Sequence, residues 1–214
     1  MPNSRRLVVN ADDFGFTRDV NDGIVECFRD GILRSTTLMA NGNAFDHAVC
    51  AAEANPKLDI GCHLVLVAGE SLSEPGRRLP SPIPELLRRL PPSEWIEQEF
   101  RSQIERLRGS GISPTHLDTH KHTHLIPRVL EALLRVAREY SIPWIRRPFD
   151  LPVGAYPAGL KRSLISMAIR PLQIPFNKRL RRYECRATDY FAGFQMTGDY
   201  ESAQLVALLE TLPP

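Results

Sequence analysis

Residues 7–15 read Leu7-Val8-Val9-Asn10-Ala11-Asp12-Asp13-Phe14-Gly15, so a short apolar run passes directly into two adjacent carboxylates. The apolar part has the length and composition of a short buried strand. Adjacent carboxylates at such a place are costly unless they are solvated, paired or bound to a cation. In α/β folds, sites are built at the carboxyl ends of parallel strands. The stretch therefore predicts a strand whose end carries functional carboxylates.

A second polar concentration lies at residues 115–124, where four of the six histidines of the chain fall within nine residues. Histidine is the commonest metal ligand in proteins. In an extended segment, alternate side chains point to one face, and the histidines here alternate from His120 to His124. We predict an extended, metal-binding segment. The alternative is a polar loop that happens to be rich in histidine.

A further imidazole, His63, is embedded in the apolar run of residues 58–66. Alone, such a histidine would more often be a satisfied core residue. Together, an aspartate pair, one histidine and a histidine cluster at three strand ends describe a carboxylate and imidazole metal site with open positions. Strand alternation should turn the neighbouring Cys62 to the opposite face.

Strand-like and helix-like segments alternate along the chain, which argues for an α/β fold with a mostly parallel sheet, open or closed into an irregular barrel. Residues 68–92 are rich in Pro, Ser and Gly and are expected to form a long loop. Helices are expected over 19–29, 44–55, 93–107 with Ser93 as N-cap, 127–140 and 200–209, and further strands over 35–39 and 143–148. We treat residues 1–214 as a single domain.

Bulk composition excludes several classes of protein. The net charge of +2 is too small to argue for nucleic acid as a partner, and no segment reaches the roughly 18 apolar residues of a membrane helix. Four scattered cysteines without an export signal favour a cytoplasmic protein. The basic stretch Lys161–Arg182 is interpreted as a solvated face, with a membrane-surface or acidic-ligand patch as the alternative.

With these motifs, the chain resembles the YdjC-like carbohydrate deacetylases, the group of chitooligosaccharide deacetylases and hopanoid-associated HpnK proteins. The matching stretches are residues 9–15, 35–37, 61–63, 115–124 and 188–194, in the order of the family. The resemblance implies a distorted (β/α) barrel of the polysaccharide-deacetylase type. It also implies a hydrolase that removes an acetyl group from an N-acetylated sugar, either an oligosaccharide or a glycolipid.

The resemblance also implies one divalent metal ion, with Asp13, His63 and His120 matching its ligands and Asp12 matching the proposed general base. Two imidazoles favour Zn²⁺, and Mg²⁺ is the alternative. A metal ion lowers the pKa of bound water and polarises an amide carbonyl. A neighbouring carboxylate that is not a ligand can then take the proton of the attacking water.

The remaining polar candidates are expected to support the ligands or to contact substrate. They are His116, His122, His124 and Arg147. His124 is also the alternative metal ligand if the segment curls differently, and Arg147 is a partner for Asp12 if Asp12 serves only to orient an arginine. The four histidines of the cluster are thus expected to divide into roles rather than to act as a block.

The chain departs from the family pattern near its end. Family members usually run on past Pro214 to a His-Pro motif beside the site, and no histidine follows His124 here. We expect a barrel that lacks its C-terminal part, with low turnover, retained metal binding and some tendency to form a homo-oligomer. A non-catalytic metal- or sugar-binding protein is the alternative to the enzyme.

Overall fold

The structure is a computed structural model that describes residues 6–151, 160–196 and 202–211. Its strands are β1 (Asn10–Phe14), β2 (Ser35–Leu38), β3 (Asp59–Leu64), β4 (His116–Thr119) and β5 (Trp144–Ile145). The α-helices are α1 (Arg18–Asp30), α2 (Phe45–Glu53), α3 (Ile83–Arg88), α4 (Ser93–Gly109), α5 (Pro127–Glu139), α6 (Leu160–Ile169), α7 (Gln173–Arg182) and α8 (Ser202–Thr211). Short 3₁₀ segments are η1 (His120–Leu125), η2 (Arg170–Leu172) and η3 (Phe194–Met196).

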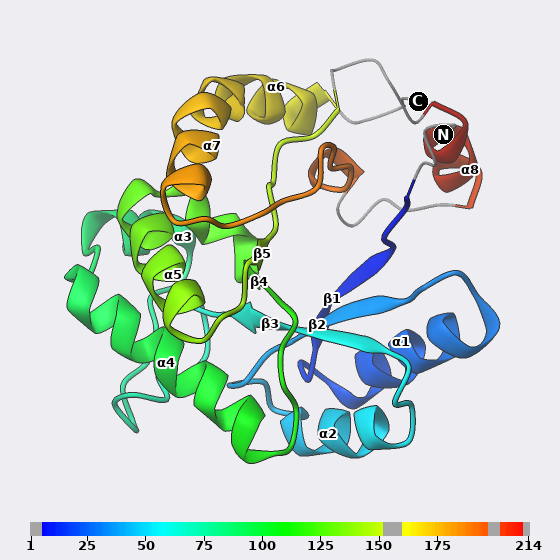
Figure 1. Ribbon diagram of the computed structural model, residues 1–214, viewed down its shortest axis with the longest axis horizontal. Coiled ribbons are helices and arrows are strands. Elements are labelled where there is room, and N and C mark those ends of the chain that lie inside the picture. The colour runs from blue at the N-terminus through cyan, green and yellow to red at the C-terminus, as the bar shows by residue number, and fades with distance from the viewer. Residues whose placement is uncertain (1–5, 152–159, 197–201, 212–214) are drawn as a thin grey trace.

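The five strands form one parallel sheet in the order β1-β2-β3-β4-β5, so neighbours in the sheet are also neighbours along the chain. This sequential order is that of a (β/α) barrel, whereas a doubly wound sheet reverses its order at a switch point. Helices α1, α2, α4 and α5 lie along the outside of the strands (Figure 1). The predicted α/β fold with a parallel sheet is confirmed.

The outer face of the sheet packs against the helices and is apolar. Ile60, Cys62 and Leu64 of β3 all lie in the hydrophobic core, where Leu117 of β4 joins them. Cys62 is fully buried there, which confirms the predicted orientation away from His63. The core therefore lies between the sheet and its helices.

The inner face of the sheet is polar and is built in two layers. One layer brings together Asn10, Ser35 and His116, whose polar atoms lie within 3.4 Å of one another. The next layer lies two residues further along each strand, as the period of a strand requires. It contains Asp12, Thr37, His63 and Asp118.

Gly61 of β3 leaves the space that His116 fills in the first layer. A Cβ on Gly61 would lie 2.6 Å from Cδ2, Nε2 and the carbonyl oxygen of His116, closer than real side chains approach. We expect Gly61→Ala to lower the free energy of unfolding by about 1–3 kcal/mol, because the backbone of β4 must move.

Gly23 in α1 provides the control for Gly61, because a Cβ there meets nothing within 4 Å. Gly23→Ala should raise the free energy of unfolding by roughly 0.5–1 kcal/mol, as removal of a mid-helix glycine does. Urea denaturation of both variants checks the pair. Equal effects of the two substitutions would contradict the packing of His116 over Gly61.

A β-bulge at the end of β1 allows both adjacent aspartates to reach the inner side. Ala11 pairs with Thr36 and Phe14 pairs with Leu38, so β1 contains one extra residue. Asp13 adopts a left-handed backbone, with φ of 65°, which is uncommon for a residue other than glycine. In a regular strand, Asp12 and Asp13 would point to opposite faces. The bulge is what brings them together.

The loop that follows β3 is anchored by Glu99 on α4, a fully buried carboxylate. Glu99 accepts hydrogen bonds from the backbone N–H of Leu72 and of Ser73, and from the hydroxyls of Ser71 and Ser73. The amide of Gln103 also donates to it, at 2.8 Å. Burial raises the pKa of Glu99, but the hydrogen bonds from Ser71 and Gln103 lower it more, so the net shift is downward.

We expect Glu99→Gln to destabilise the protein at pH 7 by about 1–3 kcal/mol, because the amide turns a donor toward groups that also donate. The pKa of Glu99 is lower in the folded state, so its contribution is complete above the unfolded-state pKa and is lost as pH falls through the folded-state pKa. The gap in unfolding free energy between wild type and variant should therefore shrink on acidification. Glu94→Gln, at an exposed position of the same helix, is the control. A gap that does not depend on pH would contradict this role.

Five details of the sequence prediction were wrong. The short buried strand predicted at residues 7–9 is not formed there: β1 begins at Asn10, and Leu7 and Val8 are 56% and 60% exposed. Ser93 is the first residue of α4 rather than its N-cap, which is Pro92. The expected loop 68–92 contains α3, because Leu86 packs fully buried in the core. The strand predicted over 143–148 pairs with β4 only at residues 144 and 145. The histidine segment, predicted to be extended, turns after Thr119. The expected start of the last helix, near residue 200, lies outside the described residues.

The basic stretch forms α6, η2 and α7. Many of its described side chains are exposed, among them Leu164, Met167 and Ile174, and this exposure fits both the solvated face and the alternative surface patch. Arg179 and Arg182 of α7 lie 3.9 Å and 3.8 Å from the carboxylate of Glu131 on α5. Within the described ranges, no helix has both the length and the apolar character needed to cross a membrane.

Candidate functional site

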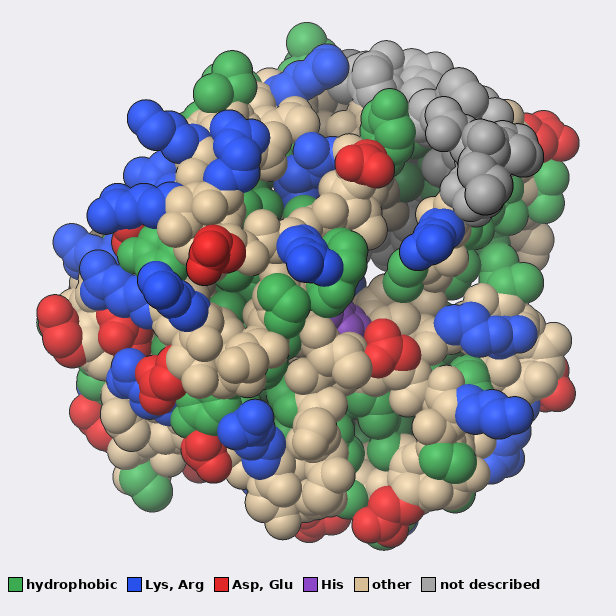
Figure 2. Space-filling view, viewed as in Figure 1, with side chains coloured by type: hydrophobic (Ala, Val, Ile, Leu, Met, Phe, Trp, Pro, Cys, Tyr) green, Lys and Arg blue, Asp and Glu red, His purple; other side chains and the backbone are tan. Residues whose placement is uncertain are grey.

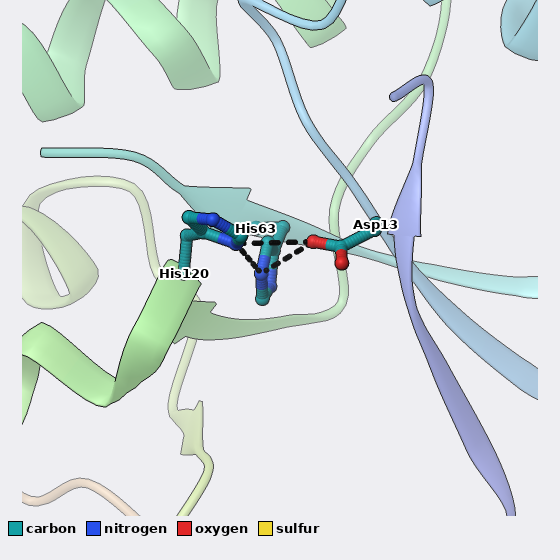
Figure 3. Close-up of side chains that lie close together, drawn as sticks. All are labelled: Asp13, His63 and His120. Atoms are coloured by element: carbon teal, nitrogen blue, oxygen red, sulfur yellow. Dashed lines mark hydrogen bonds and ion pairs between the residues drawn. The ribbon is translucent and has the colours of Figure 1, made fainter. Parts of the chain in front are cut away.

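Asp13, His63 and His120 converge at the carboxyl ends of β1, β3 and β4. The Oδ1 atom of Asp13 lies 3.3 Å from Nε2 of His63 and 3.1 Å from Nδ1 of His120. The two histidine nitrogens are 3.3 Å apart. Figure 3 shows the three side chains pointing toward one another from separate elements. The structure thus brings together the three residues that the sequence analysis named as metal ligands.

The spacing of these atoms fits a metal ion. Ligand atoms of a tetrahedral site with bonds of about 2.0–2.1 Å lie about 3.3 Å apart. The observed edges of 3.1–3.3 Å match this value. One carboxylate oxygen and two imidazole nitrogens form a donor set that suits zinc and other divalent ions. Asp13 is 38% exposed and His120 is 17% exposed, so the group remains open on one side.

The surface of the protein is hollowed on the face seen in Figure 2. A histidine side chain is visible at the floor of a hollow near the middle of this face, bordered by hydrophobic and acidic side chains. A small molecule can therefore approach imidazole groups from this side.

His63 is oriented by Asp118, which is completely buried. Nδ1 of His63 lies 2.6 Å from Oδ1 of Asp118, and because a carboxylate only accepts, Nδ1 carries the proton and donates. Thr37 donates to the other oxygen of Asp118 at 3.2 Å. This leaves Nε2 of His63 facing Asp13 and His120, in the arrangement that metal-binding histidines commonly show.

Electrostatics favour the charged forms of His63 and Asp13. Burial lowers the pKa of His63, but Asp118 and Asp13 more than compensate and raise it to about 10. Burial likewise raises the pKa of Asp13, whereas hydrogen bonds from His120 and His63 lower it well below its usual range. A cation that binds here must therefore displace a proton from His63.

Asp12 lies beside this group and is held by Arg146. The guanidinium donates two hydrogen bonds of 2.6 Å, one to each oxygen of Asp12, and also lies 2.8 Å from Asp118. Burial raises the pKa of Asp12, but Arg146 lowers that pKa by a larger amount, so the net shift is downward and the carboxyl stays ionised. Oxygen atoms of Asp12 and Asp118 lie within 4.8 Å of a nitrogen of His63, so this second cluster adjoins the first.

The second cluster, Asp12, His63 and Asp118, also has the composition of a metal site. Its carboxylates, however, are already neutralised by Arg146, and Nδ1 of His63 is used by Asp118. In the first cluster, the ion-pair partners of Asp13 among the described residues are the two histidines, which can give up a proton to a cation, so this cluster is the better candidate.

The histidine-rich segment is not extended throughout, contrary to the sequence prediction. It is a strand only to Thr119, and Lys121 and His122 then adopt left-handed backbone, with φ of 53° at each. The hydroxyl of Thr119 accepts the backbone N–H of His124 at 3.0 Å, which closes the turn. Because of this turn, His120, His122 and His124 have different surroundings.

His124 is fully buried, and both of its ring nitrogens are occupied. Nε2 donates to the carbonyl oxygen of Arg146 at 3.1 Å, so Nδ1 accepts from the hydroxyl of Thr119 at 2.5 Å. Burial lowers the pKa of His124 to about 3. His124 therefore supports the backbone that presents Arg146.

None of the other predicted polar residues, which are His116, His122 and Arg147, belongs to the triangle of Asp13, His63 and His120. His116 belongs to the first polar layer, with Nε2 3.3 Å from Oδ1 of Asn10. His122 packs against Phe191 and Phe194. Arg147 does not contact Asp12; the neighbouring Arg146 does, because Ile145 points into the core and residue 146 points to the inner face.

Three residues of the site were missed by the sequence analysis: Thr37, Asp118 and Arg146. Asp118 could have been found, because it is two residues from His116 on a predicted strand and so shares its face. The pair Arg146-Arg147 carries no signal that selects one arginine, since the choice depends on the register of β5.

Known proteins resemble this chain in sequence and in fold. A family model described as YdjC-like protein matches residues 6–214. A carbohydrate deacetylase of Clostridium beijerinckii is 45% identical over 143 residues, which cover 64% of this chain and 58% of the relative. The carbohydrate deacetylase of Brevibacillus brevis is 41% identical over 151 residues, covering 67% of this chain and 60% of the relative. That of Geobacillus stearothermophilus is 38% identical over 161 residues, covering 69% and 64%.

The matches thus span about three fifths of the length of these relatives. A solved structure from Enterococcus faecalis, described as a cellobiose-phosphate cleavage protein, superposes with a TM-score of 0.60 at 21% identity. That match covers 96% of this chain and 89% of the other, and it supports the fold alone. Since the family model matches nearly the whole sequence, the chain belongs to the YdjC-like protein family.

Proposed function

We propose that the protein is a metal-dependent hydrolase that removes the acetyl group from an N-acetylated sugar. The observation that carries the proposal is the triangle of Asp13, His63 and His120, with an ionised carboxylate, Asp12, beside it. Relatives named carbohydrate deacetylase support the sugar substrate. Two imidazoles favour zinc over magnesium, which prefers oxygen ligands.

The residues of the site would divide the chemistry as follows. Asp13, His63 and His120 would hold one divalent cation, which would supply a Lewis acid for the acetyl carbonyl and favour ionisation of water near neutral pH. Asp12 accepts the proton of the water molecule that attacks the carbonyl carbon. The C–N bond then breaks, and the departing amine takes up a proton, for which protonated Asp12 is an available source.

Arg146 and Asp118 position the reacting groups in this scheme. Arg146 fixes both oxygens of Asp12 and keeps that carboxylate ionised. Asp118 fixes one proton of His63 on Nδ1, so Nε2 is the atom of His63 that would bind the cation once it has lost its own proton. Neither residue needs to contact the substrate to affect the rate.

Acetate release from N-acetylglucosamine oligomers tests the proposed function. The zinc-loaded protein should release acetate, treatment with a chelator should abolish release, and added zinc should restore it. Metal binding without acetate release from any acetylated sugar would instead indicate a non-catalytic metal- or sugar-binding protein.

Single substitutions of two histidines test the assigned division of the cluster. His120→Ala removes a predicted ligand, so bound metal and activity should be lost together. His116→Ala alters the layer beneath the site and should lower metal affinity or activity by roughly 10–100-fold at most. Metal analysis and acetate release should be measured on both variants. Equal loss of metal in the two would show that the division is wrong.

A further inference from the structure

His122 is the one member of the histidine cluster whose surroundings are mainly aromatic. Its ring centroid lies 5.6 Å from that of Phe194 and 6.1 Å from that of Phe191. Its Nδ1 atom is buried without a hydrogen-bond partner among the described residues. Left-handed backbone at Lys121 and His122 costs about 1–2 kcal/mol per residue. The turn thus holds the imidazole against the two phenylalanines rather than in a hydrogen-bond network.

The same aromatic group adjoins the reacting residues. The guanidinium carbon of Arg146 lies 5.8 Å from the ring centroid of Phe191. That guanidinium also binds both oxygens of Asp12. Phe191 is therefore separated from the proposed general base by a single side chain.

The segment that carries the phenylalanines is fixed by the carboxylate of Asp150. One oxygen accepts the backbone N–H of Gly193 at 2.9 Å and of Phe194 at 3.1 Å, and the other accepts that of Gln195 at 2.7 Å. Residues 150 and 191 also pair as a parallel bridge. Despite this anchoring, the two phenylalanines are only partly buried. Rigid, partly exposed aromatic rings beside polar groups are typical of ligand-binding sites.

We propose that Phe191 and Phe194, backed by His122, form a wall that packs against the apolar face of the sugar ring. A pyranose ring presents C–H groups on its faces and hydroxyls at its edge, so its faces suit aromatic rings and its edge suits Asp and Arg side chains. The choice of a sugar as the ligand rests on the proposed function. The wall itself is a binding feature, so it can be tested without turnover.

Calorimetric titration with N,N′-diacetylchitobiose tests the wall. The zinc-loaded Asp12→Asn protein serves as the background, because suppressed turnover allows equilibrium binding to be measured. Phe191→Leu and Phe194→Leu should each raise Kd by about tenfold, which corresponds to about 1.4 kcal/mol. Phe194→Tyr keeps an aromatic ring and should bind nearly as well as the background protein.

Phe28→Leu is the matched control. Phe28 on α1 is also partly buried and also lies under an arginine, with the guanidinium carbon of Arg34 5.9 Å from its ring centroid. Its replacement should leave Kd within twofold. Unchanged Kd in both wall variants, or an equal rise in the control, would overturn the proposal.

Two further measurements separate this proposal from the proposed function. If sugar binding depends on Phe191 and Phe194 but the protein releases no acetate, the proposed wall stands and the proposed deacetylase function is wrong. If acetate is released with the same KM in wild type and in the wall variants, the deacetylase function stands and the proposed wall is wrong. If the leucine variants do not fold, saturation-transfer NMR on the wild-type protein tests whether the sugar packs against the aromatic wall. Irradiation of aromatic protons should then saturate the pyranose C–H signals, and absence of transfer would overturn the wall.

Discussion

Asp12→Asn is expected to lower kcat for acetate release by roughly 10²–10⁴-fold while the protein retains its metal ion. The amide has nearly the shape of the carboxylate but cannot take the proton of the attacking water. Asp12 is not in the Asp13, His63 and His120 triangle, so metal content should not change. The measurement is kcat together with zinc stoichiometry in the same preparation.

Asp46→Asn is a suitable control for this substitution, because Asp46 is exposed on α2. It removes the same charge from the chain and should leave kcat and zinc unchanged. Near-normal turnover in Asp12→Asn would refute the role of Asp12 as base. Loss of zinc from that variant would show instead that Asp12 is a ligand.

His63→Ala is expected to abolish zinc binding and to reduce acetate release to the background without enzyme. His63 contributes Nε2 to the ligand triangle. Its side chain is only 2% exposed, so bulk water does not reach this position to replace the lost nitrogen as a ligand. The substitution also removes the 2.6 Å hydrogen bond from His63 to the buried Asp118 carboxylate, which keeps its contacts with Thr37 and Arg146. A buried carboxylate that loses a partner costs about 1–3 kcal/mol or more of stability.

Two further variants show whether the loss of zinc in His63→Ala is due to loss of a ligand. Asp118→Asn keeps His63 but weakens the hold on its Nδ1 proton, so metal affinity should fall by roughly 10–100-fold rather than vanish. His47→Ala, which removes a half-exposed histidine of α2, should leave zinc binding unchanged. Zinc stoichiometry equal to wild type in His63→Ala would contradict the ligand assignment.

The sequence predicted the position of the site better than its detailed geometry. An aspartate pair, a histidine and a histidine cluster near three strand ends indicated a common site, because carboxyl ends of adjacent parallel strands meet at one edge of the sheet. The family resemblance then selected Asp13, His63 and His120 as the ligands. Strand periodicity alone, however, would separate Asp12 from Asp13. Their convergence depends on the bulge and on the left-handed backbone of Asp13. Aspartate adopts this backbone more readily than most residues, but the preference does not show which aspartate of the chain will do so.

The partners that orient these groups depend on contacts between residues far apart in the sequence. Arg146 reaches Asp12 across 134 positions, and Thr37 reaches Asp118 across 81. The turn at Lys121 and His122 was missed because a run of alternating histidines resembles a strand, whereas the Thr119 hydroxyl closes a turn instead. Side-chain hydrogen bonds to the backbone compete with strand pairing in this way.

A crystal of the protein soaked in zinc, measured at the zinc absorption edge, tests the central claim most directly. We predict one strong anomalous peak in contact with Oδ1 of Asp13, Nε2 of His63 and Nδ1 of His120, at metal–nitrogen distances of about 2.0–2.1 Å. A peak that contacts none of these three atoms, or that lies between Asp12 and Asp118, would contradict the proposed metal centre.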